Sequence, residues 1–205
     1  KKVGQLFCSN GQSELMYSHA QNPQAIHLSG NIFRIFFSSR DIKNRSSIFY
    51  GDLDIDHIDK PLRVQNKPIL SFGSPGFFDD SGVTLGHLVE HNKRFYLYYL
   101  GWNLGVTVPW RNSIGLAIAT SLDGTFTKFE PVPVLDRNKH DPFSLSYPFV
   151  IPGKDSWSML YGSNLAWGES KDDMYHVLKD AYSQDGLTWK PTGKIQLEIL
   201  SLIHI

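Results

Sequence analysis

The pair Asp79-Asp80 is the part of this sequence whose chemistry is easiest to name. Neighbouring carboxylates suit general acid, general base or nucleophilic work on a glycosidic bond, where two carboxyl groups flank the bond that breaks. The alternative is that one of them accepts backbone N–H groups within its own turn, as aspartate often does. We predict Asp79 and Asp80 as the catalytic candidates.

Arginine, histidine and tryptophan side chains form a second group of candidates. Arginine forks match a carboxylate or phosphate, histidine donates to sugar hydroxyls or acts as an acid or base, and tryptophan stacks on sugar rings. The predicted substrate-binding residues are His19, Asn22, Arg40, Asp41, Arg45, Trp102, Asn103, Trp110, Arg111, His140, Asp141 and Trp167. Two alternatives stay open: Arg40 and Asp41 brace their own loop, and each histidine is structural.

A repeat of constant length spaces these candidates along the chain. Aromatic-rich apolar runs begin at Phe33, Phe95 and Trp157, so the step from the first to the second equals the step from the second to the third. A Ser-x-Asp-Gly turn at 121–124 recurs at 183–186 with the same step, and an aromatic residue follows each turn. We interpret these turns as structural, since Asp accepts the N–H groups of the turn and Gly takes positive φ.

Within a repeat, β-branched and aromatic residues alternate with Gly, Pro, Asn and Asp, which predicts four short strands. In the second repeat the strands are expected at 82–89, 94–100, 113–120 and 127–132. Four antiparallel strands at this spacing are typical of a β-propeller blade, whereas a β-sandwich does not require a fixed step. The sequence therefore predicts an all-β propeller with blades at about 17–70, 78–135 and 141–195.

The direction of the strands predicts where the candidate residues meet. Successive strands of a blade run in opposite directions, so the segment entering the first strand and the segment between the second and third share a face. These segments, at 19–22, 40–45, 78–80, 102–111, 140–141 and 164–167, carry most of the candidates. We expect them to surround an axial funnel that holds a ligand.

Composition excludes several classes of function. The 205 residues contain 20 Lys+Arg and 20 Asp+Glu, and this zero net charge argues against a nucleic-acid partner. No apolar stretch reaches the ~18 residues of a membrane span. The single Cys excludes an internal disulfide and multi-cysteine metal sites. Without phosphate-binding or dinucleotide motifs we expect no cofactor and no metal. The lone Cys and the lack of a visible signal peptide predict a cytoplasmic protein, although the chain begins with Lys rather than Met.

Five segments, 18–23, 37–41, 78–83, 98–103 and 112–117, together resemble the five-bladed propellers of glycoside hydrolase families 32, 43, 62 and 130. The similarity extends to glycosidase-like bacterial proteins named after the N-terminal domain of glucosamine inositolphosphorylceramide transferase. It implies five four-stranded antiparallel blades, which need roughly 310 residues. Residues 1–199 would then be a partial propeller of about three blades. We expect 200–205 to be a non-native tail, because a sequencing-adapter string encodes this hexapeptide in one frame.

The resemblance also implies three carboxylates, an Asp before Pro in the first blade, an Asp in the second and a Glu in the third. Here Asn22 stands before Pro23, Asp79 or Asp80 fills the second position, and 146–148 offers no carboxylate, with Asp141 nearby. Two hypotheses follow. One is a hydrolase or phosphorylase that acts on or binds a glycoside or sugar phosphate in polysaccharide metabolism or biosynthesis. The other is an inert glycan- or nucleotide-sugar-binding propeller that is accessory to a glycosyltransferase.

Overall fold

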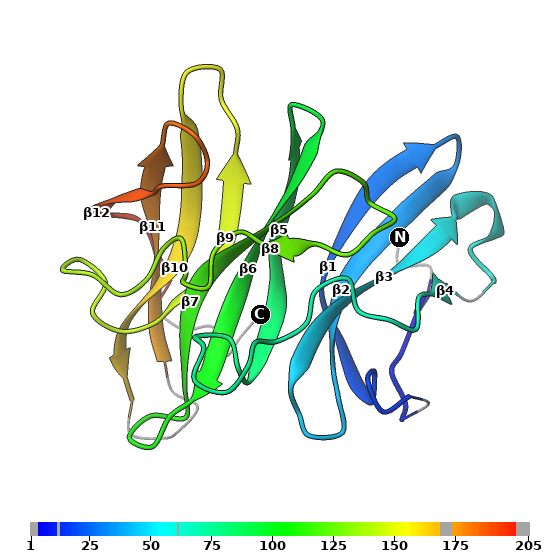
Figure 1. The fold of residues 1–205 in the computed structure, drawn as a ribbon, viewed down its shortest axis with the longest axis horizontal. Helices are drawn as coiled ribbons and strands as arrows, with labels where there is room; N and C mark the ends of the chain where they lie inside the picture. The colour runs from blue at the N-terminus through cyan, green and yellow to red at the C-terminus, as the bar shows by residue number, and fades with distance from the viewer. Residues whose placement is uncertain (1–3, 12, 61, 169–173, 200–205) are drawn as a thin grey trace.

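The computed structural model describes residues 4–11, 13–60, 62–168 and 174–199 (Figure 1). Within these residues the chain consists of strands and a short 3-10 turn at Ile55–His57, with no α-helix. The predicted all-β class is confirmed. The expected non-native tail at 200–205 lies outside the described residues.

The described strands form three antiparallel units of four strands each, in chain order. Unit I contains β1 (Ser18–Ser29), β2 (Ile32–Arg40), β3 (Ser46–Asp54) and β4 (Arg63–Val64). Unit II contains β5 (Gly82–His91), β6 (Arg94–Leu104), β7 (Trp110–Ala119) and β8 (Thr127–Lys128). Unit III contains β9 (Leu145–Ile151), β10 (Trp157–Trp167), β11 (Met174–Ser183) and β12 (Lys190–Ile199). Figure 1 shows the units side by side, and a parallel pairing of Ser46 with Gly82 joins units I and II.

Three segments that the sequence predicts as loops are strands in whole or in part, and one of them, 164–167, is the end of β10. The ladder between β6 and β7 continues through the pairs Trp102–Asn112 and Leu104–Trp110, so the expected loop at 102–111 shrinks to 105–109. The loop expectation is wrong because aromatic residues at strand ends keep pairing and packing across the ladder. As a result, the ladder holds Trp102 and Trp110 in fixed positions.

The segment 19–22, predicted to lie before the first strand, is part of β1. Its register on β2 shifts between Ser18 and Gln21 and again between Gln21 and Gln24. His19 and Asn22 have positive φ angles of 67° and 53°. Irregularities of this kind bend a strand and re-aim its side chains.

Unit II is apolar on both faces because side chains alternate along its strands. On β6, Leu97 and Tyr99 lie in the core shared with unit I, whereas Tyr98 lies in the core shared with unit III. All three side chains are fully buried. This two-sided burial fixes how the three units are placed and therefore where their strand ends meet.

The Ser-x-Asp-Gly turns contact the preceding unit. Arg34 of unit I donates to the Leu122 carbonyl (2.8 Å) and to Asp123 Oδ1 (2.7 Å), and Tyr98 of unit II donates to the Gly186 carbonyl (2.6 Å). The turns therefore join neighbouring units, which is the structural role that their sequence indicates.

Candidate functional site

A cavity of about 490 Å³ opens where strand ends of all three units converge. The predicted binding residues Asn22, Arg40, Trp102 and Trp110 line it. Ten further residues line it that the sequence prediction did not include: Gln21, Asn44, Thr84, Leu100, Leu104, Asn112, Ser146, Tyr147, Met174 and His176. The cavity is large enough for a small sugar.

The first strand of each unit contributes one equivalent residue to the cavity. Asn22 on β1, Thr84 on β5 and Ser146 on β9 all line it, and their spacing is that of the sequence repeat. All three side chains are uncharged and polar. None of the described residues that line the cavity is Asp or Glu. The part of the wall that the structure describes therefore offers hydrogen bonds without a carboxylate.

Arg40 is the charged group of this wall. Its Nη1 donates to Asn44 Oδ1 (2.9 Å), and its guanidinium carbon lies 5.6 Å from the centre of the Trp102 ring. Its Nε is buried and has no hydrogen-bond partner among the described residues, and no described carboxylate forms an ion pair with it. Burial lowers the pKa of Arg40, but an arginine stays charged at neutral pH. Among the described residues, Arg40 thus has no ion-pair partner for its positive charge and no hydrogen-bond partner for its Nε.

Tryptophan rings form the apolar part of the wall. Trp102 lines the cavity and is anchored by a hydrogen bond from its Nε1 to Ser46 Oγ (2.8 Å). Trp110 also lines the cavity and packs edge-on against Trp167, with ring centroids 5.5 Å apart. Anchored indole faces beside polar groups suit a sugar ring, whose faces are apolar and whose edges are polar.

The backbone around the cavity is strained. Asn22, Asn44 and Tyr147 line the cavity with φ angles of 53°, 65° and 47°. Asparagine tolerates the left-handed region, whereas a bulky residue such as tyrosine enters it at a cost. Strain that clusters at one place is a feature of functional sites.

The predicted catalytic residue Asp79 lies away from this cavity. It is 1% exposed, and its Oδ2 accepts hydrogen bonds from Lys128 Nζ (2.6 Å) and Tyr99 OH (3.1 Å). It lines a smaller cavity of about 330 Å³ together with Phe77, Phe78 and Phe129. Its neighbour Asp80 accepts the Gly76 N–H and the Ser81 hydroxyl, both at 2.9 Å, as a turn residue does.

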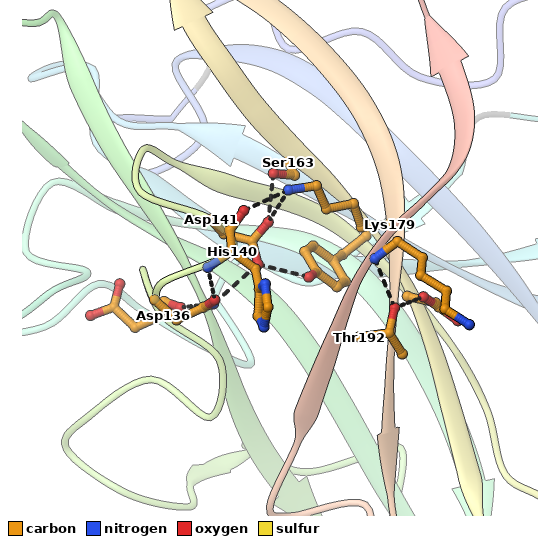
Figure 2. A network of polar contacts seen from close by, with 10 residues as sticks. Asp136, His140, Asp141, Ser163, Lys179 and Thr192 are labelled. Carbon is orange, nitrogen blue, oxygen red and sulfur yellow. Dashed lines mark hydrogen bonds and ion pairs between the residues drawn. The ribbon is translucent and has the colours of Figure 1, made fainter.

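Asp141, a predicted binding residue, repeats the arrangement of Asp79 in unit III (Figure 2). Its Oδ1 accepts from Ser163 Oγ (2.7 Å) and Lys179 Nζ (2.9 Å), and its Oδ2 accepts from Tyr161 OH (2.9 Å) and Asn138 Nδ2 (3.1 Å). In both units the tyrosine follows the aspartate by 20 residues. Burial raises the pKa of Asp141, but these hydrogen bonds outweigh it, and the pKa lies below the ordinary value. Four donors leave this carboxylate little capacity for a ligand.

The other predicted residues do not line the cavity. Asp41 accepts the Lys43 and Arg45 N–H groups and pairs with the Arg45 guanidinium at 2.8 Å, so it braces the loop that holds Asn44. His19 is largely exposed. Its pKa is lowered, mainly because the ring is partly shielded from water and to a smaller extent because of the charge of Arg40. Asn103, Arg111 and Trp167 lie near the ends of β6, β7 and β10, and the His140 carbonyl accepts from Lys179 in the network of Figure 2.

No group of three or more His, Cys, Asp or Glu side chains able to hold a metal ion occurs among the described residues. In the described part of the chain, no helix is long and apolar enough to cross a membrane. Two of the additional wall residues carried a signal in the sequence, because Thr84 and Ser146 follow Asn22 at the repeat length. Applying that spacing to single residues, rather than to motifs alone, would have found them.

No protein-family model matches the chain. The uncharacterized protein Rv1502 of Mycobacterium tuberculosis (strain H37Rv) is 42% identical over 198 residues, which is 97% of this chain and 66% of the relative. The chain thus spans about two thirds of the length of this relative. A probable sucrose-6-phosphate hydrolase of Vibrio cholerae is 28% identical over 113 residues, covering 55% of this chain and 19% of the relative.

Solved structures align over most of the chain at low identity. A family 117 glycoside hydrolase of Zobellia galactanivorans aligns with a TM-score of 0.64 and 15% identity, covering 98% of this chain and 52% of that one. A thermostable family-43 glycoside hydrolase aligns with a TM-score of 0.60 and 15% identity, over 93% and 58% of the two chains. The sucrose-6-phosphate hydrolase of Lactobacillus gasseri aligns with a TM-score of 0.61 and 16% identity, covering 87% of this chain and 35% of that one.

The chain shares the fold of these glycoside hydrolases. This confirms the resemblance at the level of a glycoside hydrolase fold. The assignment to the group of families 32, 43, 62 and 130 stays a prediction, as does the number of blades.

Proposed function

We propose that this protein binds a carbohydrate with an anionic substituent, such as a sugar phosphate, in the larger cavity. The observation that carries the proposal is Arg40, whose buried Nε has no hydrogen-bond partner among the described residues and whose charge forms no ion pair with a described carboxylate. Guanidinium groups bind phosphate and carboxylate through charge-assisted hydrogen bonds. The indole rings of Trp102 and Trp110 would hold the sugar beside that anion.

The fold shared with glycoside hydrolases supports a carbohydrate as the ligand. The Vibrio cholerae relative is named as a probable sucrose-6-phosphate hydrolase, which suggests a phosphorylated sugar as the first ligand to test. Binding at this site fits an accessory role beside a glycosyltransferase in polysaccharide metabolism or biosynthesis.

Binding is favoured over hydrolysis because the described wall lacks the groups that hydrolysis needs. Glycoside hydrolysis uses two carboxyl groups on either side of the scissile bond. The equivalent positions of the three units are Asn22, Thr84 and Ser146, which do not ionise at neutral pH. The carboxylate of Asp79 is engaged by Lys128 and Tyr99 on another cavity.

Hydrolysis or phosphorolysis by Asp79 and Asp80 is the second candidate function, and one specific observation favours it. The Ser81 N–H donates to the Trp102 carbonyl (3.1 Å), so the turn that carries Asp80 is attached to the wall of the larger cavity. An Asp80 side chain that moved with this turn would approach a bound ligand from the strand end.

Calorimetric titration with sucrose 6-phosphate, sucrose and inorganic phosphate tests the proposal. We expect sucrose 6-phosphate to bind about tenfold or more tightly than sucrose, and the difference to shrink as salt is added. Arg40→Gln should remove the difference, while Arg40→Lys, which keeps the charge without the fork, should retain part of it. Arg111→Gln is the matched control, because Arg111 is exposed and does not line the cavity. If sucrose 6-phosphate and sucrose bind the wild type equally tightly, and Arg40→Gln changes neither affinity, the proposed anion site is wrong.

Incubating the protein with the same ligands, and with an array of glycans and nucleotide sugars, and assaying for product distinguishes binding from turnover. We expect binding without product, unchanged in an Asp79→Asn/Asp80→Asn double variant. Product that forms with the wild type and is abolished in the folded double variant would establish the enzyme instead.

We further propose that the three units are blades of a five-bladed propeller. The outward face of unit III supports this, since Leu160 and Leu197 are 38% and 56% exposed. The residues one repeat earlier than Leu160 and Leu197 are Tyr98 and Leu135, which lie on the face of unit II that unit III covers, and both are buried. An apolar face of this pattern suits the packing of another unit of the same kind.

Binding of a hydrophobic fluorescent dye tests this arrangement. The 205-residue chain is expected to bind the dye strongly, and the longer Rv1502 protein, folded under the same conditions, to bind it weakly. Leu160→Asp should reduce the dye signal of the 205-residue chain. Equal dye signals from the two proteins would refute the proposal that another unit covers this face of unit III.

A further inference from the structure

Unit III carries three polar side chains whose hydrogen-bonding atoms have no partner among the described residues. They are the Ser146 hydroxyl, both amide atoms of Asn164 and the Nδ1 of His176. The three side chains are at least nine-tenths buried. Buried polar groups are nearly always paired, so three unpaired side chains in one place require an explanation.

The register of the strands places the three residues on one face of unit III. Ser146 on β9 is opposite Gly162 on β10, and His176 on β11 is opposite Asn164 on β10. Gly162 and Asn164 are two residues apart on β10 and therefore share a face. A Cβ on Gly162 would lie 2.6 Å from Ser146 Oγ, so this glycine leaves the space that the serine occupies.

Two members of this cluster, hereafter the polar trio of Ser146, Asn164 and His176, border the larger cavity, whereas Asn164, opposite His176 on β10, is fully buried and does not line it. Ser146 and His176 line the cavity directly, on the side that unit III contributes. Arg40 lies on the side that unit I contributes. The cavity therefore has a cationic side and a separate side of unpaired polar groups.

We infer that the polar trio is a subsite for neighbouring hydroxyl groups of a neutral part of the ligand, while Arg40 holds the anion. This inference rests on the proposed function of the cavity. The amide of Asn164 offers a donor and an acceptor side by side, which matches two adjacent hydroxyls, each of them both donor and acceptor. A serine hydroxyl and an imidazole nitrogen add one contact each.

The protonation state of His176 agrees with this assignment. Burial lowers its pKa and outweighs a hydrogen bond to the Met174 backbone, so the imidazole is neutral at neutral pH. A neutral ring presents an acceptor or a donor to a hydroxyl group but does not attract an anion. The trio therefore suits the uncharged ring of a sugar and not its phosphate.

Titration with inorganic phosphate and with a set of sugar phosphates tests the subsite. The set contains sucrose 6-phosphate and the 6-phosphates of glucose, mannose, galactose and fructose. At least one of them is expected to bind the wild type about tenfold or more tightly than phosphate alone. Asn164→Leu should remove this preference and leave phosphate binding intact, whereas Arg40→Gln should weaken both.

Thermal unfolding of the same variant provides a second readout. Asn164→Leu replaces an unpaired buried amide by an apolar group of similar size and should keep or raise the melting temperature of the free protein. Ser163→Ala is the matched control, because Ser163 is adjacent on β10 but donates to Asp141. It should lower the melting temperature and leave the preference for the sugar unchanged.

The outcomes separate the two proposals. If phosphate and every sugar phosphate fail to bind, the proposed function is wrong. If Arg40→Gln abolishes binding but Asn164→Leu keeps the sugar preference, the proposed function holds and the subsite is refuted. A large loss of stability in Asn164→Leu would likewise refute it, since the amide would then be paired through water.

Discussion

Replacing Lys179 by methionine is expected to destabilise the protein strongly, because it leaves the Asp141 carboxylate buried without a counter-charge. The Lys179 side chain is 5% exposed and that of Asp141 is fully buried, with Nζ 2.9 Å from Oδ1. Ser163, Tyr161 and Asn138 still donate to the carboxylate after the change, so its hydrogen bonds are largely kept. What is lost is the positive charge, together with the hydrogen bond from Lys179 to the His140 carbonyl.

Removing one partner of a buried ion pair costs about 3–5 kcal/mol. A domain of this size loses roughly 2–4 °C of melting temperature per kcal/mol, so Lys179→Met should lower it by roughly 6–20 °C. Asp141→Asn in the same chain removes the stranded charge. The double variant is therefore expected to recover much of the loss, since neutral replacements of a buried pair are often tolerated.

Urea unfolding followed by circular dichroism measures these free energies, with Arg45→Met as the control. Arg45 pairs with Asp41 but is more than a third exposed, so its loss should cost less than that of the buried Lys179. A cost below about 1 kcal/mol for Lys179→Met, or a double variant less stable than the single one, would refute the structural role of Asp141. Direct contact between Asp141 and a ligand would then be the better interpretation.

Two further predictions concern the interface between units II and III and the wall of the larger cavity. Burial lowers the pKa of His87, whose Nδ1 accepts the Val150 N–H (3.1 Å) between units II and III. The unfolded state binds the proton more readily, so the free energy of unfolding should fall as the pH drops below about 6.5, and His87→Asn should flatten this dependence between about pH 5 and 7 in urea titrations. Tyr147→Asn should raise the stability by up to about 1 kcal/mol, because asparagine tolerates the φ of 47°, and should weaken sugar binding at the cavity wall. An unchanged pH profile, or a less stable Tyr147→Asn variant, would contradict these two arguments.

The candidate site could be predicted from the sequence only in part. Arg40, Trp102 and Trp110 were expected at the ligand site because strand direction assigns their segments to one face, and they line the cavity. Asp79 and Asp141 share those segments but turn into the interior, where Lys128 and Lys179 bind them. The lysines lie 49 and 38 residues further along the chain, so no local pattern reveals the pairing.

What the sequence by itself determined is the repeat, the strand class and the structural turns. These follow from short-range alternation and turn chemistry, which the chain carries locally and repeats at a constant spacing. Only the tertiary structure decided which polar groups are satisfied. The pairing of Asp79 with Lys128 and the unpaired atoms of Arg40, Asn164 and His176 depend on which strands the fold brings together in space. Hydrogen-bond satisfaction is set by neighbours in space, and it separates the groups that hold the fold together from those left free for a ligand.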